Sequence, residues 1–414
     1  MSVRAPGLRG TPQVLVGIAT VVGVAELGFG TVVPLLPLYL KERLGASATL
    51  VGVVVAMFAA VETVFKTTWG GLADRIGRRP VIVGGLLLAS CAPVIMAVLR
   101  VPALFIPLRL VDGTGSAAVW PCAAAAIVDR TRSERRAAAM GTLNMFFLAG
   151  LALGPTLGLL VSGRVGEYQA GFYTASALLL AAAGVAAIVF RDLPAPPAAM
   201  PSRAGAPPGR RRPGALVADI LGTIRRSPSL LAMLAVGFIQ MFGVSLLAPI
   251  IVIYAHEVVR LSDQLIGLIF LVLVLAVAIA SVPGGRLADR IGRPRTVAWG
   301  MVFASAGMWM LPLAGEGHIA ILGVTALLLG GSYAVSSPAW LALMSETAPP
   351  GSTGLVMGAS ETAQGAGFVV GPVLGGLLYD HLGPRAPFVG SALLLTAGTA
   401  LAVLTLGRRD RGPA

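Results

Sequence analysis

Long apolar segments recur along the whole chain, and short stretches that hold most of the Arg and Lys residues separate them. A helix needs about 20 apolar residues to cross a bilayer, so segments of this length predict membrane-spanning helices. The pattern predicts six helices in the first half of the chain and six in the second. Their expected ranges are 14–40, 50–65, 81–98, 104–128, 137–161, 168–190, 230–254, 266–282, 296–313, 319–344, 354–378 and 387–406.

Between the two sets of helices, the chain is rich in proline and arginine and has no long apolar run. This composition predicts a flexible basic linker. We therefore expect an N-terminal six-helix bundle over 1–190, a cytoplasmic linker over 191–229, and a C-terminal six-helix bundle with a short tail over 230–414. The first apolar run is too long for a signal peptide, so we expect it to remain as the first helix.

The composition indicates a protein that is embedded in a lipid bilayer. The 414 residues are 56% hydrophobic and 12% charged, with a mean hydropathy of +0.86. One water-soluble core cannot take up so much apolar surface. The net charge of +13 lies in short clusters between apolar runs, a pattern typical of loops that face anionic lipid. We therefore exclude nucleic acid as a partner.

Lys and Arg are distributed unevenly between alternate connections. If the amino terminus is cytoplasmic, 24 of them fall on the cytoplasmic side and 6 on the other, with Arg109 left inside the fourth helix. The positive-inside rule then predicts that both termini are cytoplasmic. The preference for Arg over Lys and the abundance of Ala and Gly indicate a GC-rich bacterium, so we expect the inner (plasma) membrane.

Few residues offer catalytic or metal-binding chemistry. The two cysteines, Cys91 and Cys122, lie in apolar runs, and His256, His318 and His381 lack metal-ligand spacing. The chain has no Gly-x-x-x-x-Gly-Lys-Ser/Thr phosphate loop and no nucleophile paired with a base. We therefore expect no metal, no cofactor and no enzyme activity, and an ion gradient as the energy source.

A charged motif occurs twice, after the second and after the eighth predicted helix. The copies read Gly-Gly-Leu-Ala-Asp-Arg-Ile-Gly-Arg-Arg at 70–79 and Gly-Arg-Leu-Ala-Asp-Arg-Ile-Gly-Arg at 285–293. Asp289 minus Asp74 is 215, about half the chain. We expect both copies to be tight loops, which we call the gate motifs. Their residues are Gly70, Asp74, Arg75, Gly77, Arg78, Arg79, Gly285, Asp289, Arg290, Gly292 and Arg293.

A glycine and proline motif is also repeated, on the fifth and the eleventh predicted helix. Pro372 minus Pro155 is 217, and two nearly equal offsets imply parallel repeats of six helices. Glycines at this spacing also permit close helix packing without any transport role. The motif residues are Gly150, Gly154, Pro155, Gly158, Gly367, Gly371, Pro372, Gly375 and Gly376.

With these two repeated motifs the sequence resembles the major facilitator superfamily, and most of all its twelve-helix drug:proton antiporters. The resemblance implies an all-α membrane protein with two six-helix bundles around a central cavity. It also implies that the gate motif latches the halves together on the cytoplasmic side, with the start of the eleventh helix, 354–361, as the partner of Asp74. The fifth helix departs from the antiporter signature because Leu159 stands where a final Gly is usual.

Glu26 lies near the middle of the first predicted helix, where an ionised side chain costs about 2.5–3.5 kcal/mol on insertion scales. Protonation removes most of this cost, so Glu26 is a candidate for proton coupling or for binding a cation. A protonated, hydrogen-bonded core glutamate without a role in turnover is the alternative. Members of the family with an acid on the first helix favour the functional interpretation.

Arg109 and Asp112 are i and i+3 on the fourth helix, where they can form an ion pair. The segment resembles a family motif in which a buried Arg is tied to proton transfer. A proton relay and a structural ion pair are both compatible with the spacing. Glu62 and Lys66, at i and i+4 near the cytoplasmic end of the second helix, favour a surface or loop-supporting pair over the alternative, a substrate site.

Further polar and aromatic residues lie at helix depth on segments that line the cavity in this family. They are candidates for substrate contacts: Asn144, Gln240, Tyr333, Trp340, Glu361 and Gln364.

The leading hypothesis is proton-coupled efflux of small amphipathic or cationic organic compounds by alternating access. The alternatives are a proton-coupled uptake symporter and a non-transporting membrane sensor. The expected partners are a small-molecule substrate, protons and the lipid bilayer, and we expect a monomer.

Overall fold

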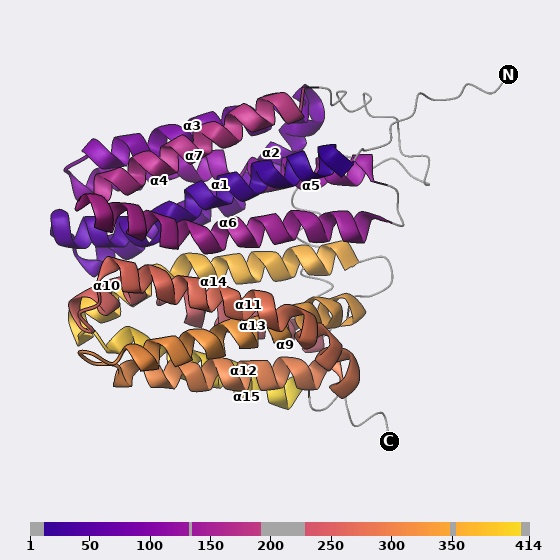
Figure 1. The fold of residues 1–414 in the computed structure, drawn as a ribbon. Coiled ribbons are helices and arrows are strands. Elements are labelled where there is room, and N and C mark those ends of the chain that lie inside the picture. The colour runs from indigo at the N-terminus through magenta and orange to yellow at the C-terminus, as the bar shows by residue number, and fades with distance from the viewer. Residues whose placement is uncertain (1–11, 132–134, 192–227, 348–352, 407–414) are drawn as a thin grey trace. The chain divides into compact units, whose positions relative to one another are not determined.

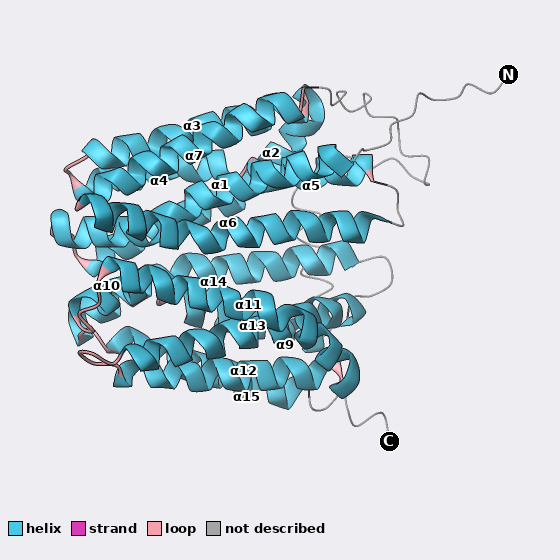
Figure 2. Cartoon of the chain, viewed as in Figure 1, coloured by secondary structure: helices cyan, strands magenta, loops and turns pink. Residues whose placement is uncertain are grey.

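The computed structural model describes residues 12–131, 135–191, 228–347 and 353–406, and nearly all of them are helical (Figures 1 and 2). The predicted linker 191–229 falls almost wholly outside these ranges. The helices are α1 (Pro12–Leu38), α2 (Ala48–Ile76), α3 (Arg78–Val98), α4 (Phe105–Ser116), α5 (Val119–Arg130), α6 (Arg136–Val165), α7 (Tyr168–Val189), α9 (Pro228–Ser245), α10 (Ile250–Glu257), α11 (Asp263–Ile291), α12 (Arg293–Met310), α13 (Ile319–Thr347), α14 (Thr353–Leu382) and α15 (Ala386–Leu406). The prediction of an all-α membrane protein is confirmed.

Ten helical segments of the described chain are long and apolar enough to cross a membrane. Helix α11 adds a shorter apolar stretch, Asp263–Val277. Helix α14 is 30 residues long, and its polar residues and glycines lower its mean hydropathy. With α4 and α5 forming one crossing and α9 and α10 another, these elements are consistent with the twelve predicted spans.

Two predicted helices are broken in the middle, and proline explains both breaks. The span predicted over 104–128 is interrupted at residues 117–118, just before Pro121. The span predicted over 230–254 is interrupted between α9 and α10, where Ala248 N–H bonds to the Ser245 carbonyl instead of continuing the α-helical pattern. Pro249 has no N–H to donate, and its ring clashes with the carbonyl four residues before it.

The prediction that both gate motifs are loops is wrong in extent. Helix α2 continues to Ile76 and α3 begins at Arg78, so the first connection is Gly77 alone, with φ of 95°. Gly292 connects α11 to α12 in the same way, with φ of 90°. Only glycine adopts such angles without strain, which explains why the same position is glycine in both copies.

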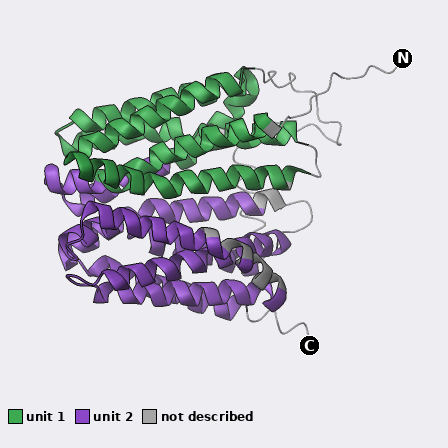
Figure 3. Ribbon diagram, viewed as in Figure 1, with its two compact units in different colours: residues 1–36, 61–200 green, residues 37–60, 201–414 purple. Residues whose placement is uncertain are grey.

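The helices divide into two compact units (Figure 3). Unit 1 comprises residues 1–36 and 61–200, and unit 2 comprises residues 37–60 and 201–414. Unit 2 therefore includes the start of α2 and a short π-helix, η1 (Tyr39–Arg43), that extends α1 beyond its predicted end.

In unit 1, the apolar core is formed mainly by α1, α3, α5 and α7. Helix α6 packs against α1 through its glycine motif. A Cβ atom at Gly150 would lie 2.2 Å from the Gly23 carbonyl oxygen, and one at Gly154 would lie 2.7 Å from the backbone of Gly30. Because the opposing atoms are backbone, the motif glycines allow a helix contact that larger residues would prevent.

In unit 2, the glycine motif of α14 makes the corresponding contact with α9. A Cβ atom at Gly367 would lie 2.6 Å from the Phe238 carbonyl oxygen, and one at Gly375 would lie 2.0 Å from the Leu246 carbonyl oxygen. The repeated motif thus marks the same helix pair in each repeat. It joins α6 to α1 in the first repeat and α14 to α9 in the second.

Unit 2 also contains a close contact between the start of α2 and α14. A Cβ atom at Gly52 would lie 2.0 Å from the Pro372 carbonyl oxygen, and one at Gly376 would lie 2.3 Å from the Ala48 carbonyl oxygen. One turn further along α14, the Asp380 carboxylate accepts hydrogen bonds from the backbone N–H groups of Ala48 (3.0 Å) and Thr49 (2.7 Å). The Thr49 hydroxyl donates a third, at 2.6 Å. Asp380 therefore caps the amino terminus of α2.

Candidate functional site

Glu26 lies half-buried near the middle of α1, on the side that meets α6. A Cβ atom at Gly150 would lie 2.9 Å from the Glu26 Cβ. Because Gly150 has no side chain, the backbone of α6 lies close to Glu26 without a steric clash. This placement puts an ionisable group among membrane-spanning helices, where it is costly unless it is protonated or paired.

Glu62 and Lys66 on α2 belong to the same electrostatic environment, which the sequence interpretation missed. Their side chains form an ion pair of 3.1 Å, and both act electrostatically on Glu26. Glu62 also acts on Arg109 and Asp112. Glu62 thus lies within electrostatic reach both of Glu26 on α1 and of the Arg109–Asp112 pair on α4. We call Glu26, Glu62, Lys66, Arg109 and Asp112 the charge group of unit 1. The i,i+4 spacing gave no hint of it because such pairs are common on exposed helices.

Arg109 and Asp112 form the predicted ion pair within α4. Both are buried, with 8% and 2% of their surface exposed. The second carboxylate oxygen of Asp112 is buried and accepts no hydrogen bond in the structure. The same region is tied to α2 by a 2.7 Å hydrogen bond from the Trp69 indole to the Thr114 carbonyl. The pair therefore occupies a buried position where a change of protonation has a large energetic effect.

Each gate motif places an arginine in an ion pair with the end of another helix. Arg78, the first residue of α3, contacts Asp129 near the end of α5 at 2.5 Å. Arg293, the first residue of α12, contacts Glu346 near the end of α13. Arg293 minus Arg78 is 215 and Glu346 minus Asp129 is 217, so the two pairs occupy equivalent positions in the repeats. The other charged residues of the first motif, Asp74, Arg75 and Arg79, are exposed, as is Arg290 of the second.

Several of the predicted cavity residues have clear surroundings in unit 2. Trp340 on α13 and Gln364 on α14 both border Gly237 on α9, where a Cβ would lie 3.3 Å and 3.4 Å from their side chains. Trp340 is 9% exposed and belongs to the unit's apolar core, whereas Tyr333 is 54% exposed. Gln240 is half-buried. Exposed candidates are Glu361 on α14 and, in unit 1, Asn144 on α6.

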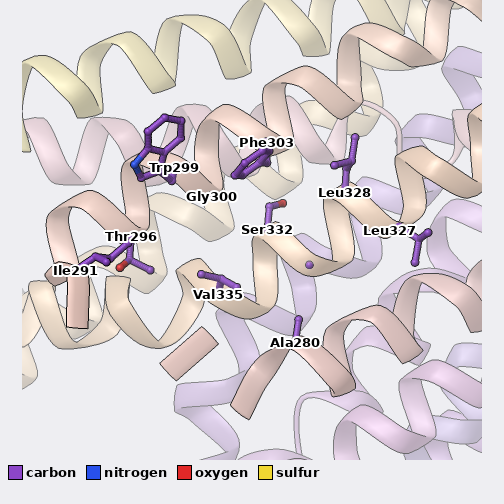
Figure 4. Close-up of a pocket in the computed structure, with 11 residues that line it drawn as sticks. Ala280, Ile291, Thr296, Trp299, Gly300, Phe303, Leu327, Leu328, Ser332 and Val335 are labelled. Carbon is purple, nitrogen blue, oxygen red and sulfur yellow. The ribbon is translucent and has the colours of Figure 1, made fainter. Parts of the chain in front are cut away.

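A groove with a volume of about 430 Å³ runs between α11, α12 and α13 (Figure 4). Its walls are mostly apolar, and Trp299 and Phe303 of α12 and Ser332 of α13 lie along it. Trp299 is 58% exposed and Phe303 is 50% exposed, so the groove opens on an outer face of these helices. None of the candidate substrate residues lines it, and we assign it no role in substrate binding.

The family model of the Major Facilitator Superfamily matches residues 18–242 and 233–414, which together cover nearly the whole chain. The chain belongs to the major facilitator superfamily. The resemblance inferred from the gate and glycine motifs is thereby confirmed, and the protein is a multi-pass membrane transporter of this superfamily.

Two curated proteins that are similar to this chain are bacterial and are named for drug resistance. It is 24% identical over 382 residues to Multidrug resistance protein 2 of Bacillus subtilis (strain 168), covering 92% of each chain. It is 26% identical over 391 residues to Multidrug resistance protein MdtG of Citrobacter koseri, covering 90% of this chain and 88% of that one.

A solved structure in the superfamily fold is also similar. It is a bacterial homologue of the human lysosomal transporter Spinster in an inward-facing and unoccupied conformation. The match has a TM-score of 0.76 at 16% identity and covers 98% of both chains. At this identity the similarity concerns the fold alone, and it agrees with the all-helical architecture.

Proposed function

We propose that this transporter exports small amphipathic or cationic organic compounds in exchange for protons, by alternating access across a bacterial inner membrane. In this proposal it acts as a monomer, with both termini in the cytoplasm as the distribution of Arg and Lys predicts. The observation that carries the proposal is the charge group of unit 1, because ionisable residues inside membrane helices are rare and mark ion or substrate pathways.

The charge group supplies chemistry that a proton antiporter needs. Glu26 is half-buried on α1 and interacts electrostatically with Glu62 and Lys66. A carboxylate in this position attracts a cation, and protonation removes the attraction. A proton and a cationic substrate can therefore compete for the same site, which is the exchange step of an antiporter. The relatives named as multidrug resistance proteins support export of varied organic compounds.

The buried ion pair of α4 gives the charge group a second proton site. Asp112 uses one carboxylate oxygen for Arg109, and none of the residues that the structure describes donates a hydrogen bond to the other. A proton on the unpartnered oxygen would weaken the ion pair without removing Arg109 from its place. In this proposal Asp112 can bind a proton in addition to the one that Glu26 binds.

Replacing Glu26 with glutamine tests the proposal. The wild type, expressed in an efflux-deficient bacterium, should export lipophilic cations in a way that a protonophore abolishes, since each proton gains about 2.3 kcal/mol per 100 mV. Glu26→Gln keeps the size of the side chain, but the amide cannot bind or release a proton. We therefore expect export to fall at least about tenfold, which corresponds to about 1.4 kcal/mol. Export of a panel of fluorescent cations and neutral drugs measures both.

The matched control is Glu316→Gln, the same change at an exposed acid in the turn before α13. It should export like the wild type. Wild-type accumulation of the compounds instead of export would favour an uptake symporter. Absence of movement of any compound in either direction would favour a sensor, and export that survives in Glu26→Gln would remove Glu26 from the mechanism.

A further inference from the structure

A histidine in unit 2 lies between two carboxylates from different segments of the chain. His256, near the end of α10, has its Nδ1 atom 2.5 Å from Oε1 of Glu42, which belongs to η1. Its Nε2 atom is 3.7 Å from Oδ1 of Asp263, the first residue of α11. The three side chains are 34%, 23% and 18% exposed, so water reaches them but does not surround them. We call these three residues the His256 cluster.

The chemistry of imidazole makes this arrangement sensitive to protonation. A neutral imidazole has one N–H donor and one nitrogen lone pair, so it can satisfy only one carboxylate and must turn its lone pair toward the other. The imidazolium ion donates from both nitrogens and carries a positive charge between two negative ones. The Asp263 Oδ1 atom is buried and accepts no hydrogen bond from the described residues, and a proton on Nε2 of His256 would give it a donor.

The other charged groups around the cluster do not replace this proton. Glu257, next to His256 on α10, accepts a 2.6 Å hydrogen bond from the Tyr379 hydroxyl on α14. Lys41 of η1 lies over the Tyr379 ring, 5.7 Å from its centroid. His256 is thus influenced by three carboxylates, those of Glu42, Asp263 and Glu257, and its protonated form is the one that balances them.

The cluster lies at the end of α11 opposite Gly292, beside the contact between α2 and α14. Two contacts hold the segment 37–60. Glu42 joins it to His256 of α10, which also faces Asp263 of α11, and the Asp380 cap joins it to α14. A proton on His256 strengthens the first contact and therefore holds this segment on the helices of the C-terminal half. Loss of the proton leaves a lone pair facing a carboxylate and weakens it.

We propose that Glu42, His256 and Asp263 form a proton-binding latch that fastens the segment 37–60 to α10 and α11 when His256 is protonated. In the proposed topology this end of the helices faces the outside, so external protons would close the outer end of the transporter. This transport consequence rests on the proposed function, whereas the binding of the proton and the fastening of the segment do not.

Hydrogen–deuterium exchange of the purified full-length protein in lipid nanodiscs tests the latch without any transport. Exchange of residues 38–50 is compared at about pH 5 and about pH 8, on either side of the usual histidine range, after correction for the intrinsic pH dependence of exchange. In the wild type we expect about tenfold slower exchange at the lower pH, the range of a lost hydrogen bond to a charged group. In His256→Gln this difference should disappear.

Two further variants keep the test specific. Glu42→Gln retains a hydrogen-bond acceptor but not the charge, so it should shrink the pH difference even if His256→Gln folds poorly. His318→Gln changes a histidine in the turn before α13, where Nδ1 only accepts a bond from the Gly315 N–H, and it should behave like the wild type. A pH difference that persists in both His256→Gln and Glu42→Gln, or that vanishes in His318→Gln, would overturn the latch. Failure of the transport assay alone would contradict the proposed function but not the latch.

Discussion

Replacing Gly52 with leucine should force the start of α2 away from α14 and abolish transport. The position leaves no room for a side chain, because a Cβ atom would lie 2.0 Å from the carbonyl oxygen of Pro372 and 2.7 Å from its carbonyl carbon. Both atoms are backbone and cannot rotate aside. We expect a loss of folding stability of about 3 kcal/mol or more, at or above the upper end of the usual range for overpacking. Thermal unfolding of the purified protein and the export assay measure the two effects.

Gly376→Leu should act like Gly52→Leu, because its Cβ atom would meet the Ala48 carbonyl oxygen from the other side of the same contact. The matched control is Gly323→Leu, on α13 of the same unit, where a Cβ atom has nothing within 4 Å. This change should be neutral or slightly stabilising, since glycine is about 1 kcal/mol less favourable than good helix formers. Normal stability and export in Gly52→Leu would contradict the close contact.

The contact between α2 and α14 also explains why one aspartate matters. Asp380 caps α2 through the N–H groups of Ala48 and Thr49, and these bonds form only while the glycines keep the two helices together. Packing and capping therefore support each other at this end of unit 2. Near the other end of α2, the chain makes a one-residue turn at Gly77 instead.

The repeated motifs allowed much of this architecture to be predicted from sequence. The offsets of 215 and 217 indicated parallel repeats, and the same offsets relate the ion pair of Arg78 to that of Arg293. Hydropathy predicted the apolar spans but not their breaks, because averaging over a window hides single residues such as Pro121 and Pro249. It also cut α2 short, since the charges and glycines of the gate motif look like a loop although they continue the helix to Ile76.

The candidate site was less predictable, because it depends on contacts between helices. Glu26, Arg109 and Asp112 could be found as single charges in apolar segments, since such charges are costly. Glu62 and Lys66 could not, because their i,i+4 spacing is also typical of solvated surface pairs. The His256 cluster could not be predicted from the sequence at all. Its members come from η1, α10 and α11, and their nearness is decided only by how these elements pack.

Replacing Asp112 alone with leucine should destabilise the protein strongly, and replacing Arg109 at the same time should restore it. The two form an ion pair and are 2% and 8% exposed, so removal of Asp112 takes away the carboxylate that faces the buried charge of Arg109. Breaking such a pair costs about 3–5 kcal/mol, whereas replacing both partners with apolar residues is often neutral or stabilising. We therefore expect Arg109→Met/Asp112→Leu to unfold near the wild-type temperature and Asp112→Leu to unfold well below it.

The double variant distinguishes a structural ion pair from a proton relay. A structural pair only has to keep the protein folded, whereas a relay also needs side chains that bind and release protons. In our proposal, Arg109→Met/Asp112→Leu folds and still does not couple export to protons. Return of protonophore-sensitive export together with stability would make the pair purely structural. The control is Lys66→Met, which breaks a 3.1 Å pair in which Lys66 is 44% exposed. Such pairs contribute only about 0.3–0.5 kcal/mol, so this change should leave the unfolding temperature almost unchanged.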